Sequence, residues 1–565
     1  MKKSLNLILI FLISSSAISQ DYQSNIDALK KLIINKELKG DIIEQKFSPV
    51  AQEDLAISFV VHDTKRDKSD TYYFNLVDLD KNKIRFFTKK NAVLVEAKTK
   101  GDRKFIQYET DGKLGNYVNE INIQAQNIEN AREIVNNLKS IAEHAEDTKK
   151  QYFDDSGNAT AILDFLEKNI KPITINDDQF DQSFTYDKSK NGIVTFSTDN
   201  GRSTSVSYHL NFSDIDKNKI SLEVKGNALF VEAETKLKKN YVKYSEDGAV
   251  KRFVNKVSIR AENIAGGKKL KAALESLKAY ADENQKSDYD SELSYKETVK
   301  YLIDNIRIVN INDHVFDQSL GVMDKYPQVL SYKLSDGSKD ESRTFTFNPI
   351  DLNRSKIAFR TKGTQVLINV EAKPKKNFIA SLEGDQLDAY KNKFDIIASD
   401  IENAKALESA FRNLIKLSGE QSQNILVNGK KDPSSTEMLD FLTKKIGTVN
   451  INDDSHEQSF SYDKEKHNLV KLESVNTNDS KSGTQEVNLT DLDGGKIDFQ
   501  VRGKEIFVEA QVRGGENFVK TTKNGEDGKY LNKLTMRISN IEEARVVTHV
   551  LRQLVKQQNG KLSER

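Results

Sequence analysis

The chain has 565 residues, with 86 lysines and arginines against 85 aspartates and glutamates, and it contains no cysteine and no tryptophan. A chain of this length corresponds to several domains of roughly 100–200 residues each. The balance of charge argues against a dedicated nucleic-acid binder, whose domains are usually basic. The lack of cysteine excludes disulfides, thiol catalysis and thiolate metal sites.

Residues 1–19 predict export. Lys2 and Lys3 precede the apolar run Leu5–Ile13, and Ala17-Ile18-Ser19 supplies small residues for cleavage. These are the three parts of a secretory signal peptide, and the apolar run is too short to span a bilayer. An N-terminal core helix is the alternative, but only Asn6 interrupts the run. We therefore expect a soluble mature protein that is secreted or periplasmic.

Two short phrases recur four times with one period. The first is an acidic residue followed by glutamine, and its glutamines are Gln45, Gln182, Gln318 and Gln458, which lie 137, 136 and 140 residues apart. The second is Val-Glu-Ala, and its glutamates are Glu96, Glu232, Glu371 and Glu509, spaced by 136, 139 and 138. This period predicts whole domains rather than solenoid repeats. We expect four copies, at residues 20–150, 151–288, 289–424 and 425–565.

The pattern within a copy predicts an α+β fold. Each copy shows a helical stripe, then about seven alternating strands that would form an antiparallel barrel or bent sheet, then a second amphipathic helix. In the first copy this last helix carries Ile128, Ala131, Ile134, Leu138 and Ile141. The expected N-caps of the four last helices are Asn127, Asn263, Asp400 and Asn540. Polar stretches at 143–158, 281–294 and 419–436 predict linkers.

Local signals mark helix starts and turns. Ser294 with Glu297 and Ser434 with Glu437 have the spacing of capping boxes. The dipeptides Asp247-Gly248 and Asp527-Gly528 predict tight turns between strands.

The stretches Tyr72–Ile84 and Val93–Ala97, followed by the last helix, resemble the middle strands and C-terminal helix of pleckstrin-homology-like domains. The resemblance implies a small β-barrel closed by one helix. Phosphoinositide-binding members use a basic first hairpin with an arginine on the second strand. The basic loops Asp187–Lys190 and Asp463–Lys466 lack that arginine, so the resemblance does not imply this activity.

The recurring polar residues have two interpretations each. The four glutamates lie in an otherwise apolar strand, where a functional carboxylate could act, but catalysis usually needs a second titrating group nearby. Pairing with a lysine on the next strand is the favoured interpretation. For the four glutamines we favour hydrogen bonds to backbone over ligand binding. Asp78–Ile84 begins like a calcium loop, but Lys83 stands where such loops need glycine, which favours a polar turn.

Basic loops follow the Val-Glu-Ala phrase in three copies and give the one set of candidate ligand-binding residues. They are Lys98, Lys100, Arg103 and Lys104; Lys236, Lys238 and Lys239; and Lys373, Lys375 and Lys376. Three aligned basic clusters could bind an acidic polymer or an anionic lipid surface through multivalency. Ordinary solvated hairpins are the alternative.

No motif predicts an enzyme, a metal or a cofactor. The seven histidines do not recur in all four copies and none has ligand spacing, and nucleophile elbows and phosphate-binding glycine loops are missing from the sequence. We therefore expect a non-enzymatic binding or scaffold protein of the cell envelope, whose partner is an envelope or extracellular protein or an acidic polymer. A hydrolase or inhibitor with a site shared between copies is the alternative.

Overall fold

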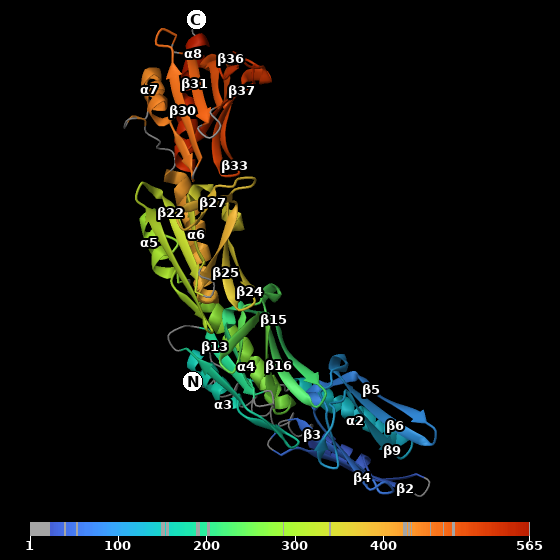
Figure 1. The fold of residues 1–565 in the computed structure, drawn as a ribbon. Helices are drawn as coiled ribbons and strands as arrows, with labels where there is room; N and C mark the ends of the chain where they lie inside the picture. Colours follow the sequence, from blue (N-terminus) through green and yellow to red (C-terminus); the bar gives the residue numbers. More distant parts are fainter. Residues whose placement is uncertain are drawn as a thin grey trace, which may run out of the picture. The chain divides into compact units, whose positions relative to one another are not determined.

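The computed structural model describes residues 23–563 except 39–40, 52, 54, 148–152, 154–157, 188–191, 200–203, 286–287, 338–340, 422–426, 428–429, 431, 453, 467 and 477–480. The expected signal peptide and the loop residues Lys188–Lys190 lie outside the described residues. The chain divides into two compact units, Met1–Lys286 and Ser287–Arg565 (Figure 1). Each unit contains two consecutive segments with closely similar orders of elements. We number these segments 1 (23–147), 2 (153–285), 3 (288–421) and 4 (427–563).

Segment 1 opens the N-terminal unit with a helix at residues 23–32. Its further elements are β1 Lys36–Leu38, β2 Asp41–Pro49, β3 Ala56–Asp63, β4 Lys68–Asn75, the 3-10 helix η1 Leu76–Asp78, β5 Leu79–Lys89, β6 Ala92–Thr99, η2 Lys100–Asp102, β7 Gln107–Thr110, β8 Lys113–Leu114, β9 Glu120–Ala125 and α2 Ile128–Asp147.

Segment 2 completes the N-terminal unit and follows the same order. Its elements are α3 Ala159–Asn169, β10 Ile173–Ile175, β11 Asp178–Phe180, β12 Gln182–Tyr186, β13 Ile193–Asp199, β14 Ser205–Asn211, η3 Phe212–Asp214, β15 Ile215–Lys225, β16 Ala228–Thr235, η4 Lys236–Lys238, β17 Val242–Glu246, β18 Ala249–Val254, β19 Lys256–Ala261 and α4 Ile264–Glu283.

Segment 3 opens the C-terminal unit. Its elements are α5 Tyr295–Asn305, β20 Val309–Ile311, β21 His314–Met323, β22 Tyr326–Asp336, β23 Glu341–Phe347, η5 Pro349–Asp351, η6 Arg354–Lys356, β24 Ala358–Lys362, β25 Gln365–Glu371, β26 Ile379–Glu383, β27 Gln386–Lys391, β28 Lys393–Ala398 and α6 Ile401–Gln421.

Segment 4 ends the chain. Its elements are α7 Ser435–Lys445, β29 Val449–Ile451, β30 Asp454–Tyr462, β31 Leu469–Asn476, β32 Lys481–Asn488, η7 Leu489–Asp491, β33 Leu492–Arg502, β34 Glu505–Val512, η8 Arg513–Gly515, β35 Lys520–Lys523, β36 Glu526–Asp527, β37 Lys533–Ile538 and α8 Ile541–Ser563.

The α+β expectation is confirmed, but the strands described form no closed barrel. Each segment has a larger and a smaller antiparallel sheet, and in segment 2 the strands β10 and β11 form a separate pair. In segment 1 a larger sheet has the order β1-β2-β3-β4-β7-β8 and a smaller sheet the order β5-β6-β9. The chain changes sheets at η1, whose 3-10 turn follows the last residue of β4 in the larger sheet and leads into β5 of the smaller sheet. Segments 1, 3 and 4 each contain nine described strands, more than the seven expected, because short hairpins such as β7–β8 extend the larger sheet.

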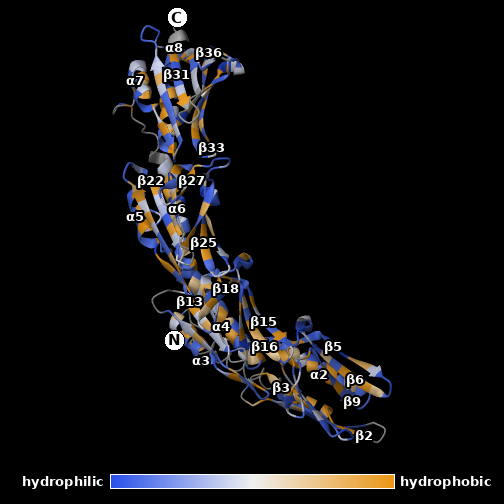
Figure 2. Cartoon of the chain, viewed as in Figure 1, coloured by the Kyte–Doolittle hydropathy of each residue, from blue (hydrophilic) through white to orange (hydrophobic). Residues whose placement is uncertain are grey.

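The helices follow the apolar stripes of the sequence. The C-terminal helix of each segment packs on the smaller sheet and the preceding helix packs on it, as for α4 with β15, β16, β19 and α3 (Figure 1). Figure 2 shows the alternation of apolar and polar residues along the strands that this packing requires. The four expected N-caps each accept a hydrogen bond from the backbone N–H three residues on. Both expected capping boxes are confirmed.

One of the two predicted turns is wrong. Asp247-Gly248 joins β17 to β18 with positive φ at both residues, as expected. In segment 4 the turn is made instead by Asn524-Gly525, with φ of 50° and 85°, and Asp527 lies in β36. Asparagine followed by glycine tolerates two consecutive left-handed residues best, so this dipeptide takes the turn.

The predicted linkers are partly ordered structure. Residues 143–147 belong to α2. Within the 281–294 stretch the Tyr289 side chain is buried, its hydroxyl lies 2.9 Å from Thr298 Oγ1, and Asn413 Nδ2 donates to it across 2.7 Å. In the 419–436 stretch Val427 is buried in the core of segment 4. Within the part of the chain that the structure describes, no helix is both long and apolar enough to cross a membrane.

Candidate functional site

The two segments of the N-terminal unit meet at an ion pair between Asp78 and Lys268. Asp78 closes η1, which begins where the Val77 N–H donates to Asn75 Oδ1 across 3.0 Å. Lys268 lies four residues after the first residue of α4. The two side chains are only 9% and 12% exposed. Because an unpaired charge at this depth costs several kcal/mol, each residue requires the other, and the pair holds α4 against segment 1.

Aromatic side chains reinforce this contact. Phe105 and Tyr117 extend from segment 1 into the core of segment 2 and are 7% and 2% exposed. Burial, with a smaller contribution from the charge of Glu109, raises the pKa of the Tyr117 hydroxyl. Beside them the Leu114 N–H donates to Asn176 Oδ1 across 3.0 Å, and Asn176 Nδ2 donates back to the Leu114 carbonyl across 3.4 Å. We call this whole contact a junction.

The C-terminal unit contains a junction at corresponding positions. Arg545 of α8 contacts Asp351 of η5, with 2.5 Å between the guanidinium nitrogen and Oδ2. Arg545 again lies four residues after the first residue of its helix, and Asp351 three residues after the capping asparagine. The Phe378 ring stacks on Phe499 with centroids 4.8 Å apart.

The pair of hydrogen bonds between an asparagine side chain and the backbone of a leucine also recurs in the C-terminal junction. Leu387 N–H donates to Asn452 Oδ1, and Asn452 Nδ2 donates to the Leu387 carbonyl, both across 3.1 Å. Two further contacts strengthen this junction. Glu542 accepts hydrogen bonds from Asn348 Nδ2 and Gln328 Nε2 at 3.0 and 3.1 Å, and Lys376 pairs with Asp498 at 3.1 Å.

A basic groove of about 1040 Å³ runs along the junction of the N-terminal unit. Its cations come from both segments and are Lys100, Arg103, Lys104, Lys217, Lys268 and Lys271. Lys100 pairs with Glu146 and Lys271 with Glu275. For Arg103, Lys104 and Lys217 the described residues offer no ion-pair partner. Glu223 also lines the groove, so its six cations face four carboxylates, which leaves a local excess of two positive charges that an anion could neutralise.

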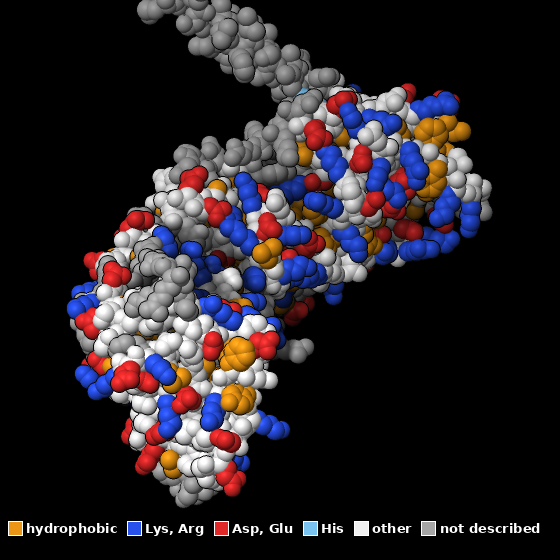
Figure 3. Space-filling model, turned by 90° about the horizontal axis from the view of Figure 1, so that it is seen from above, with side chains coloured by type: hydrophobic (Ala, Val, Ile, Leu, Met, Phe, Trp, Pro, Cys, Tyr) orange, Lys and Arg blue, Asp and Glu red, His pale blue; other side chains and the backbone are white. Residues whose placement is uncertain are grey.

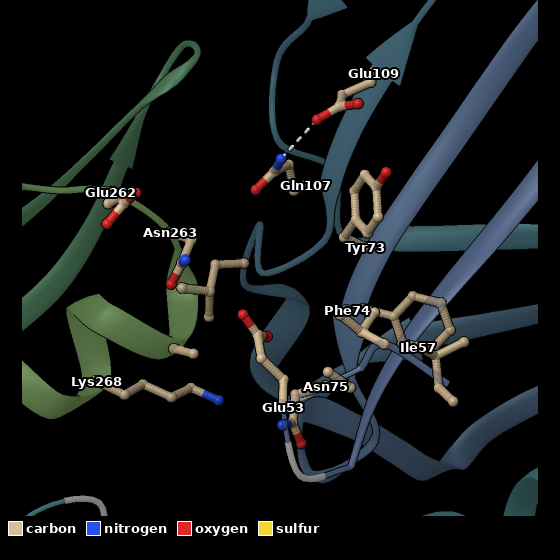
Figure 4. Close-up of a pocket in the computed structure, with 14 residues that line it drawn as sticks. Glu53, Ile57, Tyr73, Phe74, Asn75, Gln107, Glu109, Glu262, Asn263 and Lys268 are labelled. Carbon is tan, nitrogen blue, oxygen red and sulfur yellow. Dashed lines mark hydrogen bonds between the residues drawn. The ribbon is translucent and has the colours of Figure 1, made fainter. Parts of the chain in front are cut away.

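A smaller cavity of about 350 Å³ lies on the other side of Lys268. Figure 4 shows Glu53, Glu109 and Glu262 around it, with Lys268 reaching in from α4. Gln107 Nε2 donates to Glu109 Oε1 across 2.8 Å. Burial, followed by the charge of Glu109, raises the pKa of Tyr73 in its wall. Three carboxylates with one lysine suit a cationic or amine-bearing ligand, and Lys268 is engaged by Asp78.

The recurring glutamines join the two sheets of each segment. Gln458 is representative, because its Nε2 donates to the Arg537 carbonyl in β37 across 2.9 Å and its Oε1 accepts from the Arg537 N–H across 2.9 Å. Gln45, Gln182 and Gln318 make the same pair of bonds to Gln124, Arg260 and Ile397. All four side chains are buried. Their amides replace ladder partners where the larger sheet crosses the last strand of the smaller one.

Three recurring glutamates pair with cations on neighbouring strands. Glu96 accepts from Arg85 at 2.9 Å. Glu232 contacts Lys225 at 2.6 Å and Lys256 at 3.0 Å, and Glu509 contacts Arg502 at 2.7 Å and Lys533 at 2.8 Å.

Glu371 is not equivalent to the other three. In segment 3 Ile368 of β25 pairs with Ile396, which lies five residues before the start of α6. In segment 1 Val95 of β6 pairs with Ile123, which lies five residues before the start of α2, so Ile368 and Val95 are equivalent. The Val-Glu-Ala phrase of segment 3 therefore lies two residues further along its strand, although the chain from Ile368 to Phe378 is as long as the chain from Val95 to Phe105. Asn369 stands at the position of Glu96, and Glu371 at that of Lys98.

The basic candidate residues have different surroundings in the three segments. Lys98 lies in β6 and pairs with Glu120 at 2.7 Å. Lys100, Arg103 and Lys104 line the groove. In segment 2 Lys236 pairs with Asp282 at 3.5 Å, and Lys238 and Lys239 are exposed. In segment 3 Lys373 and Lys375 are exposed, whereas Lys376 belongs to the junction through Asp498.

The acidic and basic residues of the junctions were not predicted from the sequence. The sequence predicts a polar turn between strands at Asp78, but Asp78 ends a 3-10 helix and Asp80 lies within β5. A signal was present, because Asn-x-x-Asp occurs at Asn75, Asn211, Asn348 and Asn488 with the period of the other phrases. Figure 3 shows why charge alone could not reveal these residues: lysines and arginines are mixed with aspartates and glutamates over the visible face.

No family model matches the chain, and neither a curated protein nor a solved structure matches it significantly. Within the described residues no three histidine, aspartate or glutamate side chains are grouped so that they could hold a metal ion.

Proposed function

We propose that this chain is an exported, non-enzymatic scaffold or binding protein of the cell envelope, built from four tandem copies of one α+β domain at residues 20–150, 151–288, 289–424 and 425–565. The observation that carries the proposal is the recurrence of one junction. Asp78 with Lys268 and Asp351 with Arg545 use corresponding positions in the two units. The resemblance of each copy to a pleckstrin-homology-like domain remains a prediction from the sequence pattern.

The recurring polar residues support a structural purpose for the repetition. The glutamines join the two sheets of a segment, three of the glutamates pair with neighbouring strands, and the Asn-x-x-Asp turns at Asn75 and Asn348 hold the next segment of the same unit. A scaffold needs fixed spacing between its binding surfaces. Buried ion pairs and inserted aromatic rings provide such spacing because they restrict hinge motion between segments.

Distance measurement between spin labels tests the rigid junction in the whole mature chain. The chain has no cysteine, so Lys139→Cys in α2 and Lys251→Cys in β18 would label one site in each segment of the N-terminal unit. We expect one narrow distance distribution, which Asp78→Ala or Phe105→Ser broadens. Lys81→Ala is the control, because it removes an exposed ion pair to Glu143 within segment 1. A broad distribution in the unsubstituted chain would contradict the scaffold.

Fractionation of the source cell tests export independently. The mature chain, lacking residues 1–19, is expected in the envelope or the medium, and deletion of these residues should retain it in the cytoplasm. Full-length protein in the cytoplasm would contradict export and leave the junction measurement unaffected.

A second candidate function is the binding of an acidic polymer in the groove of the N-terminal unit. The specific observation in its favour is the group of Arg103, Lys104 and Lys217, three exposed or half-exposed cations with no ion-pair partner in the described structure, which lie along one hollow of about 1040 Å³.

A further inference from the structure

In both junctions the earlier segment contributes an Asn-x-x-Asp turn and two aromatic rings, and the later segment contributes the start of its last helix. Segment 4 has residues equivalent to the earlier segment's half, and among the described residues nothing packs on them. Phe518 corresponds to Phe105 and Phe378, because each directly precedes the residue that bridges to the next hairpin strand. Tyr530 corresponds in the same way to Tyr117 and Tyr390. Phe518 and Tyr530 are 52% and 56% exposed, whereas Phe378 is 6% exposed.

The polar members of this half are also present. Asn488 caps η7, and Asp491 ends it, at the positions of Asn348 and Asp351. Glu516 is exposed and stands where segment 3 has Lys376, since the N–H of each donates to the carbonyl three residues before it. We call Asn488, Asp491, Glu516, Phe518 and Tyr530 the tail face.

Segment 1 has residues equivalent to the half that the later segment contributes to a junction. Ile128 and Arg132 of α2 correspond to Ile541 and Arg545 of α8, and Ile128 is 40% exposed whereas Ile541 is 9% exposed. Arg132 pairs with Glu129 at 3.2 Å, as Arg545 pairs with Glu542 at 3.6 Å while also holding Asp351. Arg85 and the half-buried Phe86 correspond to Asp498 and Phe499. We call Arg85, Phe86, Ile128, Glu129 and Arg132 the head face.

The charges of the two faces are complementary. Asp491 and Arg132 would repeat the pair of Asp351 with Arg545, and Asn488 with Glu129 would repeat the hydrogen bond of Asn348 to Glu542. The third pair is reversed in sign. Lys376 meets Asp498 within the C-terminal unit, whereas the tail face offers Glu516 to Arg85 of the head face. Both members of this pair have changed sign, so the attraction is retained.

From these correspondences we propose that the tail face of one chain docks on the head face of a second copy of this chain, forming a head-to-tail assembly. The inference rests on the proposed array of four equivalent copies and names its partner. A contact between two different faces of the same molecule is heterologous and propagates into a filament or closes into a ring.

One difference predicts that this contact is weaker than the internal junctions. Asn176 and Asn452 exchange hydrogen bonds with the backbone of the preceding segment. In segment 1 the corresponding position is Lys39, so the sequence lacks that amide. Assembly should therefore be reversible and dependent on protein concentration.

Sedimentation of the mature full-length chain tests the proposal. The average mass should rise with concentration, and either Phe518→Glu on the tail face or Arg132→Glu on the head face should hold the protein at the mass of one chain. A mixture of these two variants still has one intact head and one intact tail, so it should form dimers and stop there. Val475→Glu, on β31 outside both faces, is the matched control, because Val475 is a comparably exposed apolar residue.

The reversed charge pair gives a second readout. Glu516→Arg should abolish assembly, and mixing it with Arg85→Glu should restore growth beyond dimers, because the swapped pair and the unsubstituted pair then alternate along the assembly. A single-chain mass up to millimolar concentration would overturn the proposal, as would assembly that survives both blocking variants or growth beyond dimers in the mixture of Phe518→Glu with Arg132→Glu. The spin-label distances within the N-terminal unit report the internal junction separately, so failure of the array and failure of the assembly are distinguishable.

Discussion

At the scale of single residues, one buried glutamine side chain in each segment makes the two backbone hydrogen bonds that a neighbouring strand would otherwise make. Gln458 shows this in β30, where its side chain satisfies both the N–H and the carbonyl of Arg537 in β37. A buried backbone group without a partner costs about 1–3 kcal/mol. The glutamine therefore fixes how far the two sheets lie apart as well as their registration.

We expect Gln458→Leu to destabilise segment 4 by about 2–3 kcal/mol, because the leucine fills the space and leaves the Arg537 backbone unsatisfied. Hydrogen exchange of the α8 peptides in the full chain measures the loss. Gln511→Leu, on the exposed face of β34, is the control and should change exchange little. Equal effects of the two substitutions would contradict the role of the buried amide.

Glu232 predicts a pH dependence. Burial alone raises the pKa of its carboxyl, but hydrogen bonds and charge from Lys225 and Lys256 outweigh burial and lower the pKa below the usual 4.5. The folded state therefore favours the charged form, and its contribution to stability is present above pH 4.5 and is lost as the pH falls through the lowered pKa.

Glu232→Gln is expected to destabilise segment 2 by about 1–2 kcal/mol at pH 7, and this difference from the unsubstituted chain should shrink in acid. Denaturant titrations at several pH values measure it. Glu223→Gln, an exposed residue in the same hairpin, serves as the comparison. A difference that stays constant down to pH 3 would contradict the assignment.

The residue scale also shows what sequence could predict. Backbone bonding by the glutamines and lysine pairing by Glu232 follow from a polar residue in an apolar strand. The partner of Asp78 did not follow, because Lys268 lies in another segment and the pair forms only when two domains dock. Nothing local to either residue indicates the distance between them.

At the scale of elements, the turn after the central strand of the smaller sheet has a left-handed residue in every segment, Lys375 in segment 3 and two consecutive residues in segments 1, 2 and 4. Gly101 and Gly514 occupy this position with φ of 62° and 64°, and Leu237 occupies it with φ of 54°. Leu237 is 87% exposed. A side chain there has a conformational cost and gains no packing.

Leu237→Gly is therefore expected to stabilise segment 2 by about 0.5–1 kcal/mol. Left-handed backbone costs an ordinary residue about 1–2 kcal/mol, and the greater freedom of glycine in the unfolded chain offsets part of the gain. Thermal unfolding measures the change. Gly514→Leu is the reverse experiment and should destabilise segment 4, and a result of the same sign for both would contradict the explanation.

Helix caps and apolar stripes were predictable because they depend on residues within one turn of each other. The register of β25 was not predictable. There a phrase of identical residues, Val370-Glu371-Ala372, lies two positions out of step, since the packing of the buried Ile368 decides the register. Sequence identity is a weaker constraint than the buried face.

At the scale of the whole molecule, the groove predicts anion binding that depends on salt. Exposed charges are screened beyond about 8 Å at physiological ionic strength, so the affinity for polygalacturonate should fall steeply as salt rises. Changing Arg103, Lys104 and Lys217 to glutamate should abolish this binding. Fluorescence titration of the mature chain measures it.

The control for the groove is a variant of equal net charge, with Lys444, Lys464 and Lys466 changed to glutamate on segment 4, where all three side chains are exposed. It should retain most of the binding. Equal loss in both variants would show that overall charge, and not the groove, attracts the polymer.

The correspondence of the two junctions has a consequence for how such a chain can change in length. Segments that lie inside a unit show both halves of one joint between them, an Asn-x-x-Asp turn at one side and a cation one turn into the last helix at the other. Duplication of a gene region that spans whole segments would add a segment that already carries the residues of both halves of the junction. A duplication that begins inside a segment would separate the turn from the helix and leave a buried carboxylate without its cation. We infer that the number of segments changes by whole segments, whereas length differences of a few residues within a segment, as in the spacings of 137, 136 and 140 residues, leave the junctions intact.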